Sequence, residues 1–118
     1  MSLNSYQDLK VWQASRLLVG DVYNLCSKLP KEEIYGLSHQ MKRAAVSLPS
    51  NIAEGYRRNN RKVYVQFMGI ALGSAAELET QLILANDIYK LQTSAELKKI
   101  EEVQKMLSTM RTKLSPQP

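Results

Sequence analysis

The chain has 118 residues, of which 44% are hydrophobic and 23% charged, and its formal net charge at pH 7 is +5. This length and composition predict one folded domain, residues 1–118, and exclude a disordered chain or one that needs disulfides to hold a core. The chain has no apolar run of about 18 residues, and its N-terminus lacks the basic and apolar regions of a signal peptide. We therefore expect a cytoplasmic protein that does not enter a membrane.

Four helical segments are predicted, at residues 6–28, 31–58, 61–91 and 95–114, because apolar residues recur along each at steps of three and four. The first segment ends before Pro30, since the residue that precedes a proline avoids the α conformation. The second contains Pro49, which removes one backbone hydrogen bond, so we expect a kink there. The alternative is two shorter helices, broken at Leu48.

The third segment is the longest, and its first half is rich in small residues such as Gly69 and Gly73, which let a neighbouring helix approach closely. Its strong helical period is formed by Phe67, Ile70, Ala71, Ser74, Leu78, Gln81, Leu82, Ala85, Ile88 and Tyr89. The fourth segment has an apolar face opposite lysines and glutamates. Four helices joined by short turns predict an all-α fold, an antiparallel up-down-up-down four-helix bundle whose second helix is kinked near Pro49.

A polar stripe interrupts the apolar pattern of the second helix. Its members are Arg43, Ser47, Asn51, Glu54 and Arg58. Steps of three and four place them on one helix face, where they either satisfy one another between helices or form a site that binds a ligand. Glu77 on the third helix can approach this stripe. We expect Arg43 to form an internal ion pair with Glu54 or Glu77, which fixes the register of the helices and has no catalytic role.

Positive charge is concentrated in the sequence RRNNRK at residues 57–62. Its cations are Arg57, Arg58, Arg61 and Lys62. The pattern predicts an exposed turn between the second and third helices. Such a turn is either only solvated or contacts a nucleic acid, because four cations can neutralise several phosphates. Tyr56 and Tyr64 flank it, so base stacking is an alternative to packing of these rings in the core or between subunits.

Residues that commonly carry chemistry are few. His39 is the only histidine, and Cys26, the only cysteine, lies among apolar residues at helical spacing, which is typical of a core position. A di-iron site in a helix bundle needs repeated Glu-x-x-His pairs, and the sequence contains none. We therefore expect no catalytic residue, no metal site and no cofactor.

Three sequence blocks, in this order, carry a resemblance to a known family. They are YQDLKVWQAS at 6–15, LPKEEIYGLSHQMKRAAVSLPSNIAEGYRR at 29–58 and FMGIALGSAAELETQLILA at 67–85. In these blocks the chain resembles the four-helix bundle proteins encoded in intervening sequences of bacterial 23S rRNA genes. The resemblance extends to about Leu91, and the tail beyond it mixes charges of both signs and follows no family motif.

The resemblance implies a bundle without established enzymatic activity that forms a homo-oligomer, expected to be a pentamer. It also implies kinship with the accessory variability protein of diversity-generating retroelements, a basic pentameric bundle that binds nucleic acid and a reverse transcriptase. The expected function is therefore non-catalytic binding of RNA or DNA phosphates by Arg57, Arg58, Arg61 and Lys62. The alternative is an oligomeric protein–protein adaptor whose partner is another bacterial protein.

Overall fold

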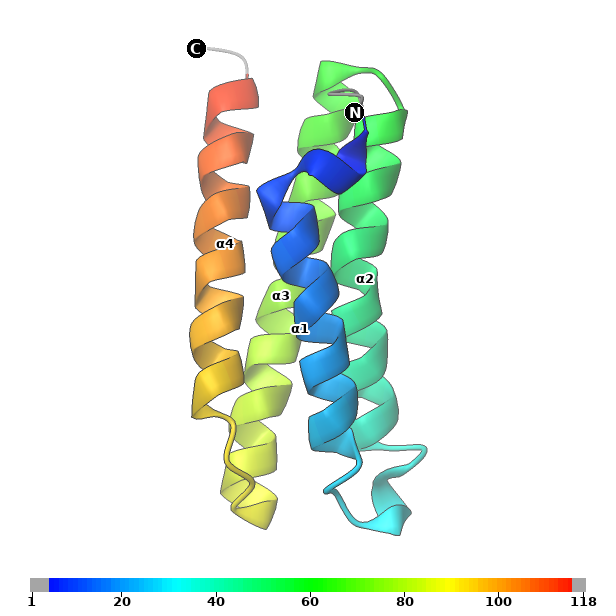
Figure 1. Ribbon diagram of the computed structural model, residues 1–118, viewed down its shortest axis with the longest axis vertical. Helices are drawn as coiled ribbons and strands as arrows, with labels where there is room; N and C mark the ends of the chain where they lie inside the picture. The colour runs from blue at the N-terminus through cyan, green and yellow to red at the C-terminus, as the bar shows by residue number, and fades with distance from the viewer. Residues whose placement is uncertain (1–4, 116–118) are drawn as a thin grey trace.

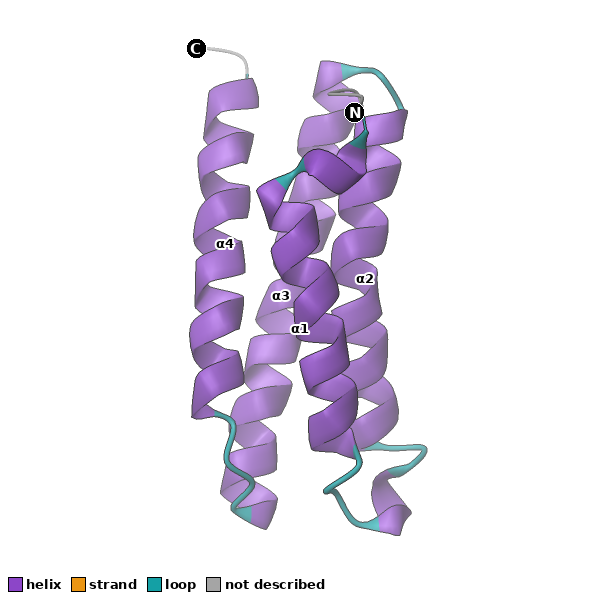
Figure 2. Cartoon of the chain, in the orientation of Figure 1, coloured by secondary structure: helices purple, strands orange, loops and turns teal. Residues whose placement is uncertain are grey.

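The computed structural model describes residues 5–115, and four long helices account for most of them (Figure 1, Figure 2). They are α1 (Lys10–Cys26), α2 (Leu37–Arg57), α3 (Arg61–Tyr89) and α4 (Ser94–Leu114). Two short 3-10 helices, η1 (Tyr6–Asp8) and η2 (Lys31–Glu33), precede α1 and α2. Because the described part of the chain contains no strand, the predicted all-α four-helix fold is confirmed.

Each helix packs against its neighbours in sequence, and α1 also packs against α4. Successive helices run in alternating directions in Figure 1, in agreement with the predicted up-down-up-down order. All four helices contribute apolar side chains to one core. The largest fully buried side chains include Leu18, Met41, Leu48, Ile52, Met68, Leu78, Leu82, Ile100 and Leu107.

The predicted bounds of the first, third and fourth helices need small corrections. The segment expected at 6–28 is divided into η1 and α1, because Leu9 between them has an extended backbone (φ −74°, ψ 128°), and α1 ends at Cys26. The helix expected at 61–91 ends at Tyr89, where Lys90 adopts the left-handed conformation that terminates many helices (φ 57°). The helix expected at 95–114 begins one residue earlier, at Ser94.

The second helix shows the largest difference, because the segment expected at 31–58 becomes an α-helix only from Leu37. Residues 31–33 form η2 instead, and the Glu33 carboxylate then accepts the Leu37 backbone N–H at 2.9 Å. This bond caps the start of α2, as side-chain oxygens commonly do. It also lowers the pKa of Glu33, with a further contribution from the Tyr89 hydroxyl, which donates to the same carboxylate.

Helix α2 continues through Pro49 to Arg57, so the alternative of two helices broken at Leu48 is wrong. The proline frees the carbonyl of the residue four positions earlier. Beside it, the Asn51 amide donates to the Ser47 carbonyl at 2.8 Å and lies 2.7 Å from the Ser47 hydroxyl. These bonds tie together the turn that contains the proline, and a kink at this position stays a prediction.

Helices α2 and α3 share the most extensive contact in the bundle. A Cβ atom added at Gly55 would lie 2.6 Å from the Phe67 Cβ atom, so glycine permits this close approach. Farther along the contact, the Ser47 and Ser74 hydroxyls are 2.7 Å apart. Among the small residues of α3, Ala71 and Ala75 are fully buried, in agreement with the predicted close packing. Gly73 is an exception, because a Cβ atom added there would meet no described atom within 4 Å.

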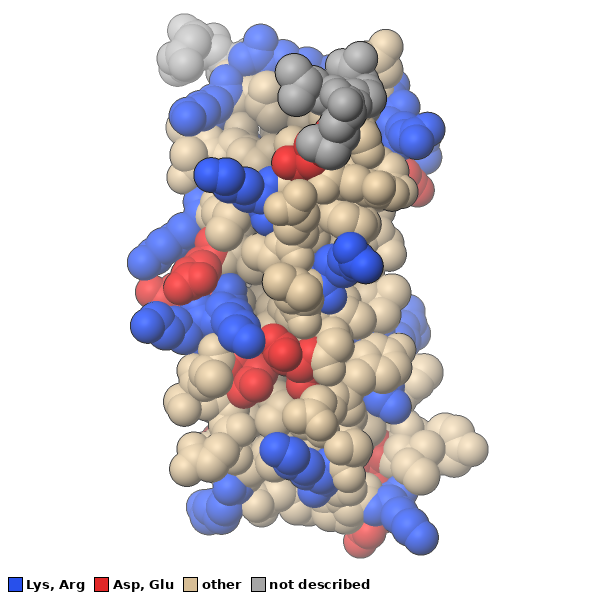
Figure 3. Space-filling view, viewed as in Figure 1, with Lys and Arg blue, Asp and Glu red and all other residues tan. Residues whose placement is uncertain are grey.

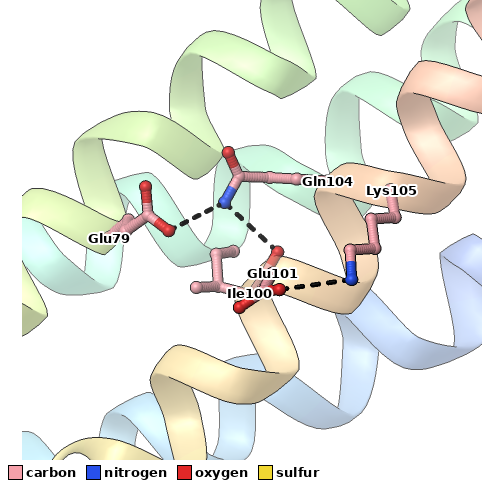
Figure 4. A network of polar contacts seen from close by, with 5 residues as sticks. All are labelled: Glu79, Ile100, Glu101, Gln104 and Lys105. Carbon is pink, nitrogen blue, oxygen red and sulfur yellow. Dashed lines mark hydrogen bonds and ion pairs between the residues drawn. The ribbon is translucent and has the colours of Figure 1, made fainter.

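Helix α4 is connected to α3 by polar side chains as well as by the core (Figure 4). The Gln104 amide donates to the Glu79 carboxylate at 3.2 Å and to the Ile100 carbonyl at 3.4 Å. On α4 itself, Lys105 and Glu101 form an exposed ion pair at 3.2 Å. Exposed pairs of this kind contribute little to stability, so burial of the apolar face of α4 holds this helix in place.

Cys26 is a core residue, as predicted, and only 6% of it is exposed. Its thiol donates to the Ser38 carbonyl of α2 over 3.7 Å. Burial raises the pKa of this thiol above its ordinary value. Because the thiolate is the reactive form of cysteine, Cys26 is held in its unreactive form.

Four large apolar residues of α3 are exposed to solvent. Ile70 is 51% exposed, Ile83 47%, Leu84 41% and Ile88 59%, so the helical period of this segment includes exposed positions as well as core positions. The spacing of Ile70, Leu84 and Ile88 places these three on one helix face, here called the α3 stripe, with the exposed Glu77 between Ile70 and Leu84. No helix within residues 5–115 is long and apolar enough to cross a bilayer. An outward apolar stripe on such a bundle is typical of a protein–protein contact.

Replacing Gly55 by Ala tests the close approach of α2 and α3. We expect Gly55→Ala to lower the free energy of unfolding by about 1–3 kcal/mol, because the new methyl group overlaps Phe67. The matched control is Gly73→Ala at an exposed helical position, which should raise that free energy by about 0.5–1 kcal/mol. Urea unfolding followed by circular dichroism measures both, and an equal gain from the two substitutions would contradict the packing described.

Candidate functional site

Cationic side chains gather at the end of the bundle that holds the α2–α3 turn and the last turn of α4. These residues, here called the basic end, are Arg57, Arg58, Arg61, Lys62, Arg111 and Lys113. Figure 3 shows Lys and Arg side chains around this end on the face displayed, where few Asp or Glu side chains accompany them. The packing of the bundle therefore places the four cations predicted at residues 57–62 beside two cations from α4.

The four predicted cations are all exposed, but they differ in what they contact. The Arg57 guanidinium lies 5.6 Å from the centroid of the Tyr6 ring. Arg58 lies 5.4 Å from the Phe67 ring and 3.7 Å from the Glu54 carboxylate. Within residues 5–115, Lys62 makes no ion pair, hydrogen bond or ring contact. Of these four cations, Arg58 is the one paired with a carboxylate of the described chain, so a phosphate can approach the other three without displacing a carboxylate.

Arg61 has a structural contact that the sequence did not reveal. Its Nε atom donates to the Leu114 carbonyl at 2.6 Å, and its Nη2 atom donates to the Lys113 carbonyl at 3.0 Å. The last carbonyls of a helix have no partner within the helix, and a guanidinium can satisfy two of them at once. Arg61 therefore fastens the start of α3 to the end of α4.

A cavity of about 530 Å³ lies beside the α2–α3 turn. It is lined by Gly55, Tyr56, Arg57, Asn59, Asn60, Arg61, Tyr64 and Leu114. Asn59 has a left-handed backbone (φ 52°), which asparagine tolerates better than most residues. The side-chain oxygen of Asn60 accepts the Val63 N–H at 3.0 Å and caps α3.

Tyr64 and Tyr56 meet edge to face at this cavity, with ring centroids 6.0 Å apart and an interplanar angle of 88°. The Tyr64 hydroxyl is shielded from water and has no hydrogen-bond partner among the described residues. Burial, with a smaller contribution from Tyr56, raises the pKa of Tyr64. At neutral pH this hydroxyl is protonated, so it can both donate and accept a hydrogen bond.

The predicted polar stripe lies along α2, and part of it is satisfied between helices. Ser47 bonds to Ser74 of α3, and Asn51 bonds back to Ser47. Glu54 pairs with Arg58, the residue that caps the C-terminus of α2. These contacts support the interpretation that the stripe is a set of polar groups that satisfy one another.

The other end of the stripe borders a groove of about 350 Å³ between α2 and α3. It is lined by His39, Gln40, Arg43, Ala44, Ser47, Ser74, Glu77 and Gln81. Within residues 5–115, Arg43 forms no ion pair with Glu54 or Glu77, so the predicted internal pair is wrong. Both Arg43 and Glu77 are exposed, and water solvates each charge at little cost.

Sequence reasoning missed Gln81 and Ser74 as members of this groove, because both were counted only as part of the helical period of the third segment. The buried Oε1 atom of Gln81 has no partner in the described part of the chain. Ser74, Glu77 and Gln81 recur at steps of three and four, the same signal that identified the stripe on α2. Residues 5–115 contain no group of three His, Cys, Asp or Glu side chains arranged to hold a metal ion.

Residues 7–109 match the family model described as 23S rRNA-intervening sequence protein. The match continues past Leu91, where the resemblance was expected to end, and covers most of α4. Among curated proteins, none matches this chain.

Substitutions on α3 test the two parts of the polar stripe. Ser74→Ala should lower the free energy of unfolding by about 1 kcal/mol, because it removes a partly buried hydrogen bond to Ser47. Glu77→Gln should change it by less than about 0.5 kcal/mol, since the exposed Glu77 carboxylate has no partner among residues 5–115. Urea unfolding measures both values. A large loss of stability in Glu77→Gln would instead indicate that Glu77 forms the ion pair with Arg43.

Substituting Arg61 and, as a control, its sequence neighbour Lys62 tests the contact between Arg61 and α4. Arg61→Gln should lower the free energy of unfolding by about 1 kcal/mol, because two charge-assisted hydrogen bonds to exposed carbonyls are lost. Lys62→Gln removes the same charge one residue later and should leave stability unchanged. Thermal unfolding compares the two variants, and equal melting temperatures would show that the bonds of Arg61 do not stabilise the bundle.

Proposed function

We propose the following function for this chain, which belongs to the 23S rRNA-intervening sequence protein family. It is a non-catalytic bundle that self-associates in the bacterial cytoplasm and binds RNA or DNA through the phosphates. The observation that carries this proposal is the gathering of six cations at the basic end, where Glu54 is the acidic residue ion-paired with one of them.

The basic end is suited to phosphate binding because its charges come from three helices and face water. Lys62 and Arg57 are exposed and pair with no carboxylate within residues 5–115, and Lys113 and Arg111 extend the same surface onto α4. Contacts to phosphates release counterions, so the affinity of such a surface falls steeply as salt rises. They carry little information about base sequence, and this binding is therefore expected to have little sequence specificity.

Self-association is supported by the α3 stripe, in which Ile70, Leu84 and Ile88 are each at least two-fifths exposed. Large exposed apolar residues along one helix face favour contact with another protein surface. The family resemblance leads us to expect five subunits. An assembly of five would carry about +25 if each chain contributes its +5, which strengthens binding to a polyanion.

A protein–protein adaptor is the second candidate, and the α3 stripe also favours it. If the α3 stripe binds a different bacterial protein, the basic end does not have to bind the phosphates of a nucleic acid. The two candidates are separated by nucleic-acid binding at low salt, which the adaptor does not require.

The test compares two variants with the same change in net charge. The first, Arg57→Gln/Lys62→Gln/Lys113→Gln, removes three cations of the basic end. The second, Lys28→Gln/Lys31→Gln/Lys90→Gln, removes three exposed cations from the opposite end. Fluorescence anisotropy measures the affinity of each for a labelled RNA over a series of salt concentrations, and light scattering gives the number of subunits.

We expect the first variant to lose most of its affinity, with the slope of log affinity against log salt reduced by about two to three units in magnitude. The second should bind nearly as the parent protein does. Equal losses would show that net charge, not the basic end, governs binding. No binding by the parent protein at low salt would favour the adaptor.

A further inference from the structure

We propose that the cavity beside the α2–α3 turn binds an unpaired nucleotide, so that the protein prefers a single strand of nucleic acid to a duplex. This inference rests on the proposed function, because the basic end must hold the phosphates of the same strand. It adds a binding site of defined chemistry to a surface that otherwise recognises only charge.

The cavity has the size and the lining that such a ligand requires. Its volume of about 530 Å³ lies within the range of about 300–1,000 Å³ that is typical of small-molecule sites. Its walls combine two tyrosine rings, two arginines and two asparagines. Unpaired bases are commonly bound by stacking on aromatic rings or guanidinium planes, with amides that bond to their polar edges. In a duplex the base faces and edges are already stacked and paired.

One wall of the cavity is already fixed in place. The two hydrogen bonds of Arg61 to α4 carbonyls hold its guanidinium plane beside Leu114, which also lines the cavity. A planar group held in this way loses little freedom when a base packs on it. Arg57, on the same rim, remains exposed and can contact the phosphate of the bound nucleotide.

The turn supplies unused hydrogen-bonding groups. The Asn60 side-chain oxygen is occupied by the cap of α3, which leaves its amide N–H groups as donors. The side chain of Asn59 is exposed and has no hydrogen bond among residues 5–115. Asparagine amides present both a donor and an acceptor, the pattern needed to bond to the edge of a base.

The Tyr64 hydroxyl supports this site independently of the cavity's size and lining. It lies in a residue that lines the cavity, but in the described chain it bonds to no other group. A shielded hydroxyl without a partner costs free energy, which a ligand can recover by supplying a donor or an acceptor after a small side-chain movement.

A variant that changes the cavity without changing charge tests this inference. Asn59→Gly/Tyr64→Phe removes one amide and one hydroxyl, and glycine adopts the left-handed backbone at residue 59 without strain. The matched control, Asn24→Ala, removes an exposed amide from α1 near the opposite end of the bundle. Anisotropy is measured with a short labelled single-stranded RNA and with the duplex that it forms with its complement.

We expect the parent protein to bind the single strand about tenfold more tightly than the duplex, consistent with stacking of one base. The cavity variant should lose about fivefold in affinity for the single strand and less than twofold for the duplex, and the control should lose neither. If the parent protein binds both probes equally, or if the cavity variant behaves as the control does, the inference is overturned while the proposed function stands.

A titration with uridine monophosphate, followed by NMR of the backbone amides, separates the two proposals further. Occupation of the cavity should shift the signals of Gly55, Asn59, Asn60 and Tyr64, and the shifts should weaken in the cavity variant. Shifts confined to other residues, or none, would overturn the inference. Shifts at the cavity without any binding of longer RNA would support the site and contradict the proposed function.

Discussion

The close approach of α2 and α3 is the constraint on which the rest of the structure depends. Gly55 brings the two helices together where a methyl group would overlap Phe67, and Ser47 and Ser74 bond across the same contact farther along. These contacts fix the register of the two helices. The register decides which residues of the connecting turn face outward and which line the cavity beside it. Gly55 takes part in the helix contact and in the cavity, because it packs against α3 and also lines the cavity.

Arg61 extends this arrangement to α4. Its guanidinium occupies the last carbonyls of that helix, so the positive surface at this end is assembled from three helices instead of one turn. The charge of Arg61 therefore helps to stabilise the packing of α3 against α4. Stability and recognition are linked at this residue, whereas the neighbouring Lys62 carries charge without a hydrogen bond or ion pair to another described residue.

The helical pattern of the sequence was sufficient to predict the four helices and their order, because apolar residues at steps of three and four report burial directly. It was less reliable where local geometry overrides periodicity. Leu9 separates η1 from α1, and the Glu33 cap delays the start of α2, although both stretches were expected to be α-helical. The steps of Ile70 and Ile88 match those of core residues, yet both lie outside, since a period does not indicate which face is covered.

The candidate site was predicted only in part for a related reason. The cations at 57–62 are adjacent in sequence and could be recognised there, but Arg111 and Lys113 join them only through the fold. The expected pair between Arg43 and Glu77 followed from charge and helix spacing, which do not determine the distance between two exposed side chains. The cavity depends on how Tyr64, Leu114 and the α2–α3 turn pack together, which the sequence does not determine by itself.

The burial of Cys26 gives the protein an internal reporter of its own motions. Its thiol lies where α1 meets α2, covered on all but a small part of its surface. A thiol reagent can modify it readily only when these helices separate, so the rate of labelling measures how often they do. The single cysteine makes that signal unambiguous, and it allows the opening of the bundle to be followed without introducing any probe.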